Sequence, residues 1–178
     1  MPTLRGTVAS VFAFATLAST SAAHAQAPAN AAMAALREQW KSAIGNIAAA
    51  ANELTEAEYA YRPIASVRTF GELIGHVAGS QNMYCALVLG DKPPAEDAIE
   101  KGAQTKEALV TALTASTAYC AKAYAISGAA LSRSVDMFGQ KGTKVGALTQ
   151  NAVHDGEHYG NIVTYMRMQG KVPPSSKR

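Results

Sequence analysis

The stretch TFGELIGHVAGSQNMYCALVLG, residues 69–90, predicts a helix with a defined beginning and end. Thr69 and Glu72 have the spacing of a capping box, in which each side chain accepts a hydrogen bond from the other residue's backbone N–H. Gly90 and the prolines that follow it end the helix. The apolar face of this helix carries a single histidine, His76, which we therefore expect to point into the protein interior.

Three further helices are predicted outside this stretch. Apolar residues recur at three- and four-residue steps over residues 36–54, as on one face of a helix. Similar patterns run over residues 105–126 and 143–170, the last with Thr143 as its cap. Residues 129–142 alternate like a short strand and end in a turn at GQKG. The predicted fold class is all-α, a four-helix bundle with a short extended segment before the fourth helix.

The N-terminal residues 1–25 have the three-part layout of a secretory signal peptide. Arg5 supplies a positive charge, an uncharged apolar run follows, and Ala23-His24-Ala25 is a small-x-small cleavage pattern. The run is too short and too rich in alanine for a membrane span, which needs about 20 strongly apolar residues. We expect cleavage after Ala25, a flexible tail over residues 26–32, one domain over residues 33–176, and export to the periplasm or the cell exterior.

Composition and motifs exclude several classes of function. The chain has a formal net charge of only +3, and no Lys/Arg cluster alternates with aromatic residues, so nucleic acid is not an expected partner. No serine lies in a Gly-x-Ser-x-Gly context, and no glycine-rich phosphate loop is present. The spacing of Cys85 and Cys120 fits no usual metal motif, although an oxidising compartment permits a disulfide.

The histidines form the strongest functional pattern. His154 and His158 are four residues apart and share one face of the predicted helix. Together with His76 they offer three imidazoles and leave one position open, which is the usual layout of a catalytic zinc-type site. Once the signal peptide is removed, every remaining histidine belongs to this group. The sequence predicts a metal site, and the alternative is that the three histidines only pack in the core.

The letters HDGEH also match the inverted zinc-protease pattern, in which Glu157 would be the general base. That class takes a third, acidic ligand from further along the chain, and no Asp or Glu follows Glu157. We therefore reject it and expect Glu157 and Asp155 to face solvent or to contact the metal ligands from outside. No catalytic residue is assigned. Four side chains are candidates for contacts with the ligands or a substrate: Tyr84, Gln150, Tyr159 and Asn161.

Three stretches resemble the DinB-like (YfiT-like) family of bacterial four-helix proteins. They are LTEAEYAYRPIASVRTFGELIGHVAGSQNMY (residues 54–84), HDGEHYGN (154–161) and YMRMQGKVPPSS (165–176). The resemblance spans about residues 33–176. It implies that His76, His154 and His158 are metal ligands. The family's usual glutamine after the glycine is here Asn161, a shorter amide.

The resemblance also implies a class of activity. Some relatives are thiol-dependent S-transferases or isomerases that use a metal to activate a low-molecular-weight thiol. We therefore expect a divalent transition metal, Zn²⁺ or Ni²⁺, and a small-molecule substrate such as a thiol, in a transferase or a hydrolase. The alternative is a non-catalytic metal-binding or stress-related bundle. The sequence leaves the oligomeric state open between a monomer and a homodimer.

Finally, the resemblance implies an up-down-down-up order, in which the second and third helices run parallel. Cys85 and Cys120 each lie about 15 residues after the start of their helices, so parallel helices would place them at similar heights. On this topology we expect a Cys85–Cys120 disulfide. The alternative is two buried thiols.

Overall fold

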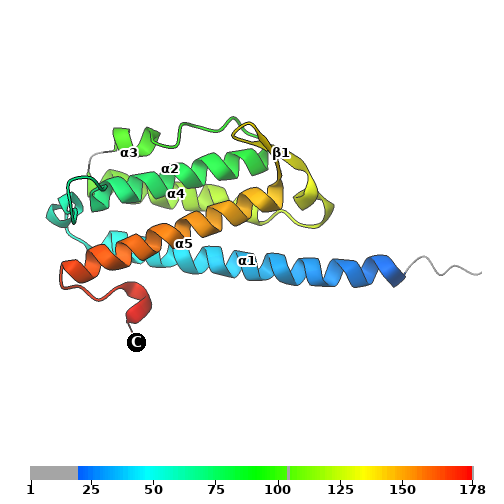
Figure 1. Ribbon diagram of the computed structural model, residues 1–178, viewed down its shortest axis with the longest axis horizontal. Helices are drawn as coiled ribbons and strands as arrows, with labels where there is room; N and C mark the ends of the chain where they lie inside the picture. The colour runs from blue at the N-terminus through cyan, green and yellow to red at the C-terminus, as the bar shows by residue number, and fades with distance from the viewer. Residues whose placement is uncertain (1–19, 104, 178) are drawn as a thin grey trace, which may run out of the picture.

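The computed structural model describes residues 20–103 and 105–177. Within these residues, long helices lie side by side in a bundle (Figure 1). They are α1 (Thr20–Glu53), α2 (Phe70–Leu89), α4 (Lys106–Tyr124) and α5 (Lys144–Met168). This arrangement confirms the predicted all-α four-helix bundle.

Short elements fill the connections between the long helices. They are η1 (Ala57–Ala60), α3 (Ala98–Gly102), η2 (Gly128–Ser132), β1 (Ser134–Met137), β2 (Gln140–Thr143) and η3 (Pro174–Ser176). Helix α3 was not predicted; it lies in the connection from α2 to α4, which reads in the sequence as an irregular segment. The extended segment before α5 is present as an antiparallel hairpin of β1 and β2.

The hairpin turns at a different place from the one predicted. Met137 pairs with Gln140, so the chain reverses at Phe138 and Gly139, and the GQKG letters belong mostly to β2. Both turn residues have positive φ, 60° at Phe138 and 85° at Gly139. Glycine adopts this conformation readily, whereas phenylalanine rarely does. The turn therefore holds an exposed aromatic side chain in an uncommon backbone conformation.

The helix boundaries follow the predicted caps. The Thr69 hydroxyl accepts a hydrogen bond from the Glu72 N–H, and the Glu72 carboxylate accepts one from the Thr69 N–H, which completes the capping box. The hydroxyl oxygen of Thr143 caps α5 as predicted, and that of Thr105 caps α4 in the same way. These contacts satisfy N–H groups that have no partner within the helix.

Helix α1 is longer than predicted. It begins at Thr20, so residues 26–32, expected as a flexible tail, are helical in the uncleaved chain. Alanine favours helix strongly, and this segment is rich in it. Of the proposed signal peptide, residues 1–19 lie outside the described part of the chain. No helix among the residues searched is both long and apolar enough to cross a membrane, despite the length of α1.

Helices α2 and α4 run in the same direction. Cys85 and Cys120 form a disulfide near the C-terminal ends of the two helices, with Cα atoms 5.3 Å apart. At the opposite ends, Leu109 of α4 packs beside Gly71 of α2. Two contacts at matching heights require parallel helices. The up-down-down-up order and the disulfide are therefore both confirmed.

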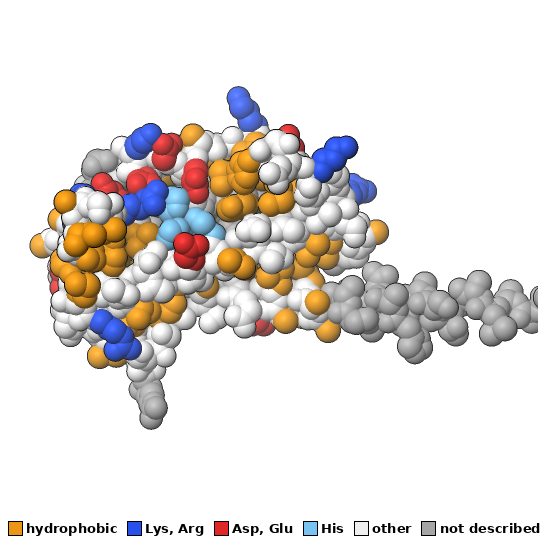
Figure 2. All heavy atoms as spheres, in the orientation of Figure 1, with side chains coloured by type: hydrophobic (Ala, Val, Ile, Leu, Met, Phe, Trp, Pro, Cys, Tyr) orange, Lys and Arg blue, Asp and Glu red, His pale blue; other side chains and the backbone are white. Residues whose placement is uncertain are grey.

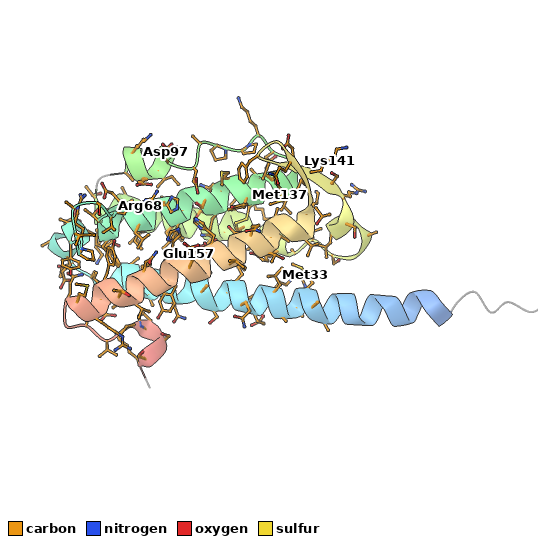
Figure 3. The ribbon with its side chains drawn as sticks, viewed as in Figure 1. Met33, Arg68, Asp97, Met137, Lys141 and Glu157 are labelled. Atoms are coloured by element: carbon orange, nitrogen blue, oxygen red, sulfur yellow. A yellow bond between two sulfur atoms is a disulfide. The ribbon has the colours of Figure 1, made fainter. Side chains whose placement is uncertain are left out.

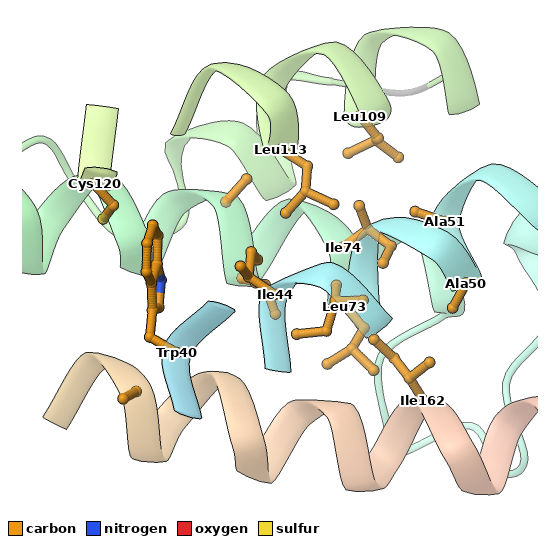
Figure 4. Packing of buried hydrophobic residues seen from close by; sticks show 14 of the residues in the cluster. Trp40, Ile44, Ala50, Ala51, Leu73, Ile74, Leu109, Leu113, Cys120 and Ile162 are labelled. Atoms are coloured by element: carbon orange, nitrogen blue, oxygen red, sulfur yellow. The ribbon is translucent and has the colours of Figure 1, made fainter. Parts of the chain in front are cut away.

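The core lies between the four long helices. It includes a buried side-chain amide whose hydrogen bonds are made by other core residues. Figure 4 shows buried side chains from several helices meeting there. The Trp40 ring stacks on that of Tyr124 with centroids 4.2 Å apart. The Trp40 indole N–H donates to the buried amide of Gln81, which in turn donates to the Ser116 hydroxyl. These bonds offset the free-energy cost of burying the amide.

Replacing both Cys85 and Cys120 with serine should lower the free energy of unfolding by about 2–4 kcal/mol, because the crosslink restricts the unfolded chain. Urea unfolding of the wild type and the double variant measures this difference. A reducing agent should lower the stability of the wild type by the same amount and leave the variant unchanged. Two titratable thiols in the unreduced wild type would contradict the disulfide.

Candidate metal centre

The structure brings the three predicted histidines together between α2 and α5. The Nε2 atom of His154 lies 3.1 Å from Nε2 of His76 and 3.0 Å from Nε2 of His158. One ligand atom from each ring lies within 4.8 Å of the others. His154 and His158 occupy successive turns of α5, and His76 faces them from α2. Both His76 and His158 are buried.

This convergence is difficult to satisfy with hydrogen bonds alone. A neutral imidazole nitrogen carries either one hydrogen or one lone pair, so Nε2 of His154 can pair with only one of its two neighbours. A metal ion would accept the lone pairs of all three nitrogens. Ligand atoms about 2.1 Å from a tetrahedral Zn²⁺ ion are roughly 3.4 Å apart, close to the spacings observed here. The donor set therefore fits a divalent transition metal.

Burial keeps two of these rings in the form that binds metal. Burial lowers the pKa of His76, and electrostatic interactions with the Arg68 guanidinium and with the His154 ring lower it further. Burial lowers the pKa of His158 to about 3, with smaller contributions from His154 and His76. Both rings are thus neutral at pH 7. Metal binding requires the neutral ring, so these two rings would need to lose no proton.

Carboxylates face the outer nitrogens of two rings. Nδ1 of His76 lies 3.6 Å from Glu100, and Nδ1 of His154 lies 4.0 Å from Asp155. Among the side chains that the structure describes, all four of these atoms are buried without a hydrogen-bond partner. Metal-bound histidines commonly donate their second N–H to a carboxylate, which fixes the ring orientation. The two carboxylates therefore lie where they could accept the outer N–H groups of metal-bound rings.

The carboxyl of Asp155 is fully buried beside this group, although its position next to His154 left solvent exposure open in the sequence. Burial raises the pKa of Asp155 to about 6, while the neighbouring His154 lowers it. The carboxyl also lies near the amide of Asn151, at 3.5 Å. Asp155 thus contacts a metal-ligand candidate from outside, which is one of the two positions expected for it. Glu157 is exposed, as the other expectation had it.

Asn161 gives the third ring its outer partner. Its side-chain amide lies 3.2 Å from Nδ1 of His158. An amide can present either its oxygen or its NH₂ group to a ring nitrogen. When Nε2 of His158 binds a metal, Nδ1 carries the hydrogen and donates it to the amide oxygen. The shorter amide at this position therefore still reaches the ring.

The other three candidates differ in their relation to the site. The Tyr84 ring lies 6.2 Å from the His154 ring and packs edge-on against Phe138. Gln150 is exposed and lines the same cavity as Tyr84, of about 330 Å³. The Tyr159 hydroxyl donates to the Ser175 hydroxyl, so this residue joins α5 to the C-terminal segment.

Two acidic residues of the site were missed in the sequence: Glu96, whose carboxylate lies close to the histidines, and Glu100. They lie in and beside α3, in the connection from α2 to α4. A signal was present, since they are four residues apart, as are Gly75 and Gly79 on α2. A Cβ at Gly75 would lie 2.8 Å from Cα of Glu100, and one at Gly79 would overlap the Glu96 carbonyl. Because glycine has no side chain, Gly75 and Gly79 allow the connection from α2 to α4 to pack directly against α2.

The histidine group is reachable from the surface. Figure 2 shows that part of the histidine side chains is visible at the surface, with acidic groups next to them and hydrophobic side chains on both sides. A cavity of about 640 Å³ is lined by His158 together with Arg68, Ile64 and Val67. Arg68 lies just before α2, and Glu157 lies on α5 (Figure 3). A small molecule could therefore reach this centre.

Sequence comparison identifies the family. The family model for the DinB superfamily matches residues 39–162, which is most of the chain. The chain belongs to the DinB superfamily. The resemblance seen in the sequence is thereby confirmed. A search of curated proteins finds no match for this DinB-superfamily chain.

Solved structures share the DinB-like fold. A DinB-like protein from Bacillus cereus ATCC 10987 superposes with a TM-score of 0.68 at 16% identity, covering 78% of this chain and 93% of that one. A mycothiol-dependent maleylpyruvate isomerase gives 0.62 at 17%, covering 82% and 78%. The DinB-like protein YjoA from Bacillus subtilis gives 0.54 at 20%, covering 80% and 98%. Identities this low show a shared fold alone.

Replacing Asn161 with leucine should weaken metal binding by about 10- to 100-fold, because the outer partner of His158 is lost. Replacement with aspartate should keep the affinity near that of the wild type, since a carboxylate oxygen still accepts the Nδ1 hydrogen. Competition against a chelator measures both dissociation constants. Equal affinity in the leucine variant and the wild type would show that the amide does not support the ring.

Proposed function

We propose that this protein is an exported, divalent-metal-dependent enzyme that acts on a small molecule through a low-molecular-weight thiol, as a transferase or a hydrolase. The convergence of the three Nε2 atoms of His76, His154 and His158 carries the proposal. Zn²⁺ and Ni²⁺ are the metals that three imidazoles in a bundle core suit best.

The metal, when bound, would lower the pKa of a thiol or of water and so generate a nucleophile at neutral pH. The protein's own residues hold the centre in place. Glu100, Asp155 and Asn161 face the outer nitrogens of the three rings and restrict how they turn. Burial keeps His76 and His158 neutral, so that their lone pairs are available.

The cavity beside His158 suits a small organic anion. Ile64 and Val67 give it an apolar wall, and both side chains are exposed. Arg68 supplies a guanidinium that is paired with Glu100 at 2.9 Å and is still partly exposed. A carboxylated thiol could place its chain on the apolar wall and its carboxylate near Arg68. The fold likeness to a mycothiol-dependent isomerase agrees with a thiol substrate.

Export is supported by two independent features. The N-terminal residues 1–25 have the layout of a signal peptide. Cys85 and Cys120 are joined by a disulfide, a bond that is rare in proteins that stay in a reducing cytosol. We therefore propose that the mature protein acts in the periplasm or outside the cell.

A non-catalytic metal-binding protein is the second candidate. The observation that favours it is the position of Glu96, whose partly exposed carboxylate lies 3.8 Å from Nε2 of His76 and 3.9 Å from Nε2 of His154. Four protein ligands are typical of a structural metal site, whereas a catalytic site keeps a position open or expands to five ligands during the reaction. Turnover assays separate the two candidates, because both predict metal binding.

The purified mature protein should bind one equivalent of Zn²⁺ or Ni²⁺, and His154→Ala should bind none. Metal bound only by the folded state adds about 2.7 kcal/mol to stability at a free concentration 100 times the dissociation constant, so the wild type alone should gain stability on loading. Elemental analysis and thermal unfolding measure these effects. Glu157→Gln, an exposed change on the same helix, is the matched control and should behave as the wild type.

Thiol-transfer and hydrolysis assays of the loaded protein then test catalysis. The enzyme proposal predicts turnover that requires the metal and is lost in His154→Ala. Metal binding without turnover on thiols of varied structure would favour the non-catalytic candidate. Absence of metal even after loading would overturn both.

A further inference from the structure

A carboxylate from the connection between α2 and α4 covers the histidine group. Oε1 of Glu96 lies 3.8 Å from Nε2 of His76 and 3.9 Å from Nε2 of His154. The Ser80 hydroxyl donates to this same oxygen at 2.6 Å, and the hydroxyl oxygen lies 3.3 Å from Nε2 of His154. One oxygen of Glu96 is thus directed at the nitrogens that converge at the centre.

These spacings are those of ligands sharing one ion. Four ligand atoms at about 2.0–2.2 Å from a tetrahedral Zn²⁺ ion are separated by roughly 3.4 Å. The nitrogen–nitrogen distances of 3.0 and 3.1 Å lie just below this value, and the two distances to Glu96 lie just above it. A shift of a few tenths of an ångström would make them equal. Carboxylate oxygen is also an ordinary Zn²⁺ ligand.

Glu96 and Glu100 approach the histidines in different ways. Glu100 faces Nδ1 of His76, the nitrogen that points away from the centre, and its side chain is only 17% exposed. Glu96 faces the Nε2 side, and its side chain is 40% exposed. Glu100 therefore orients a ring, whereas Glu96 lies between the centre and solvent.

The backbone of Glu96 is held close to α2 by a specific feature of the sequence. A Cβ at Gly79 would overlap the Glu96 carbonyl oxygen, so any larger residue there would push this segment outward. Gly79 precedes Ser80, whose hydroxyl holds the Glu96 carboxylate. Two adjacent residues of α2 thus fix the backbone and the side chain of Glu96.

We propose that Glu96 is the fourth protein ligand of the metal and controls which other ligands reach it. This inference rests on the proposed metal site. A carboxylate partly neutralises a divalent cation held by three neutral rings, so its removal should weaken metal binding. Because Glu96 lies on the solvent side, its removal should also open the metal to small anions.

The test uses the mature protein loaded with Co²⁺, whose visible absorption reports the number and type of ligands. Glu96→Gln should weaken Co²⁺ binding by about tenfold or more in chelator competition. Its spectrum should differ from that of the wild type, and azide should alter it at concentrations at least about tenfold lower. Asp97→Asn, the neighbouring carboxylate before α3 (Figure 3), should match the wild type in all three measurements.

Two results would contradict the inference, each in a different way. If the wild type binds no metal, the proposed function fails and the inference with it. If the wild type and Glu96→Gln bind Co²⁺ with the same affinity, spectrum and azide response, the metal site stands and the role of Glu96 is wrong. Should Glu96→Gln be poorly folded, Gly79→Ala replaces it, since it displaces the carboxylate without changing it. The same loss of affinity and gain of azide access is expected there, and wild-type behaviour would overturn the inference.

Discussion

The meeting of three imidazole nitrogens between α2 and α5 is the constraint on which the site depends. Buried nitrogens this close cannot all be satisfied by hydrogen bonds to one another, and burial keeps at least His76 and His158 neutral. A cation would resolve the conflict by taking every lone pair. The carboxylate oxygens of Glu100 and Asp155 that lack a hydrogen-bond partner could then accept the outer N–H groups of the rings.

Helix α2 connects this centre to the rest of the fold. One face carries His76 toward α5, and another carries Cys85 into the disulfide with α4. A third is formed by Gly75 and Gly79, against which the connection to α4 packs. Parallel packing of α2 and α4 requires that long connection, since a short turn joins only antiparallel helices. The topology thus supplies the segment that brings Glu96 to the site.

Much of the fold and the three histidines of the candidate site could be predicted from the sequence. Helix periodicity predicted the four helices, Thr69 and Thr143 marked the beginnings of two of them, and helical spacing placed His154 and His158 on one face. His76 could be expected inside the bundle, but its meeting with the pair depends on how α2 and α5 pack. The pairing of the cysteines became predictable only through the helix order that the family resemblance implies.

The acidic part of the site could not be predicted in the same way. Glu96 and Glu100 lie beside and in the short helix α3, and their four-residue spacing alone does not indicate which side chains face inward. Their positions depend on contact with two glycines from a distant part of the sequence. The turn at Phe138 was likewise misplaced, because a residue other than glycine with positive φ leaves little trace in the sequence.

X-ray absorption spectroscopy of the Zn²⁺-loaded protein tests the central claim most directly. The three histidines as ligands predict multiple-scattering features of about three imidazoles, with Zn–N distances of about 2.0–2.1 Å. His154→Ala should lose this spectrum. A zinc ion surrounded by oxygen alone, or with a single imidazole, would contradict a centre built from His76, His154 and His158.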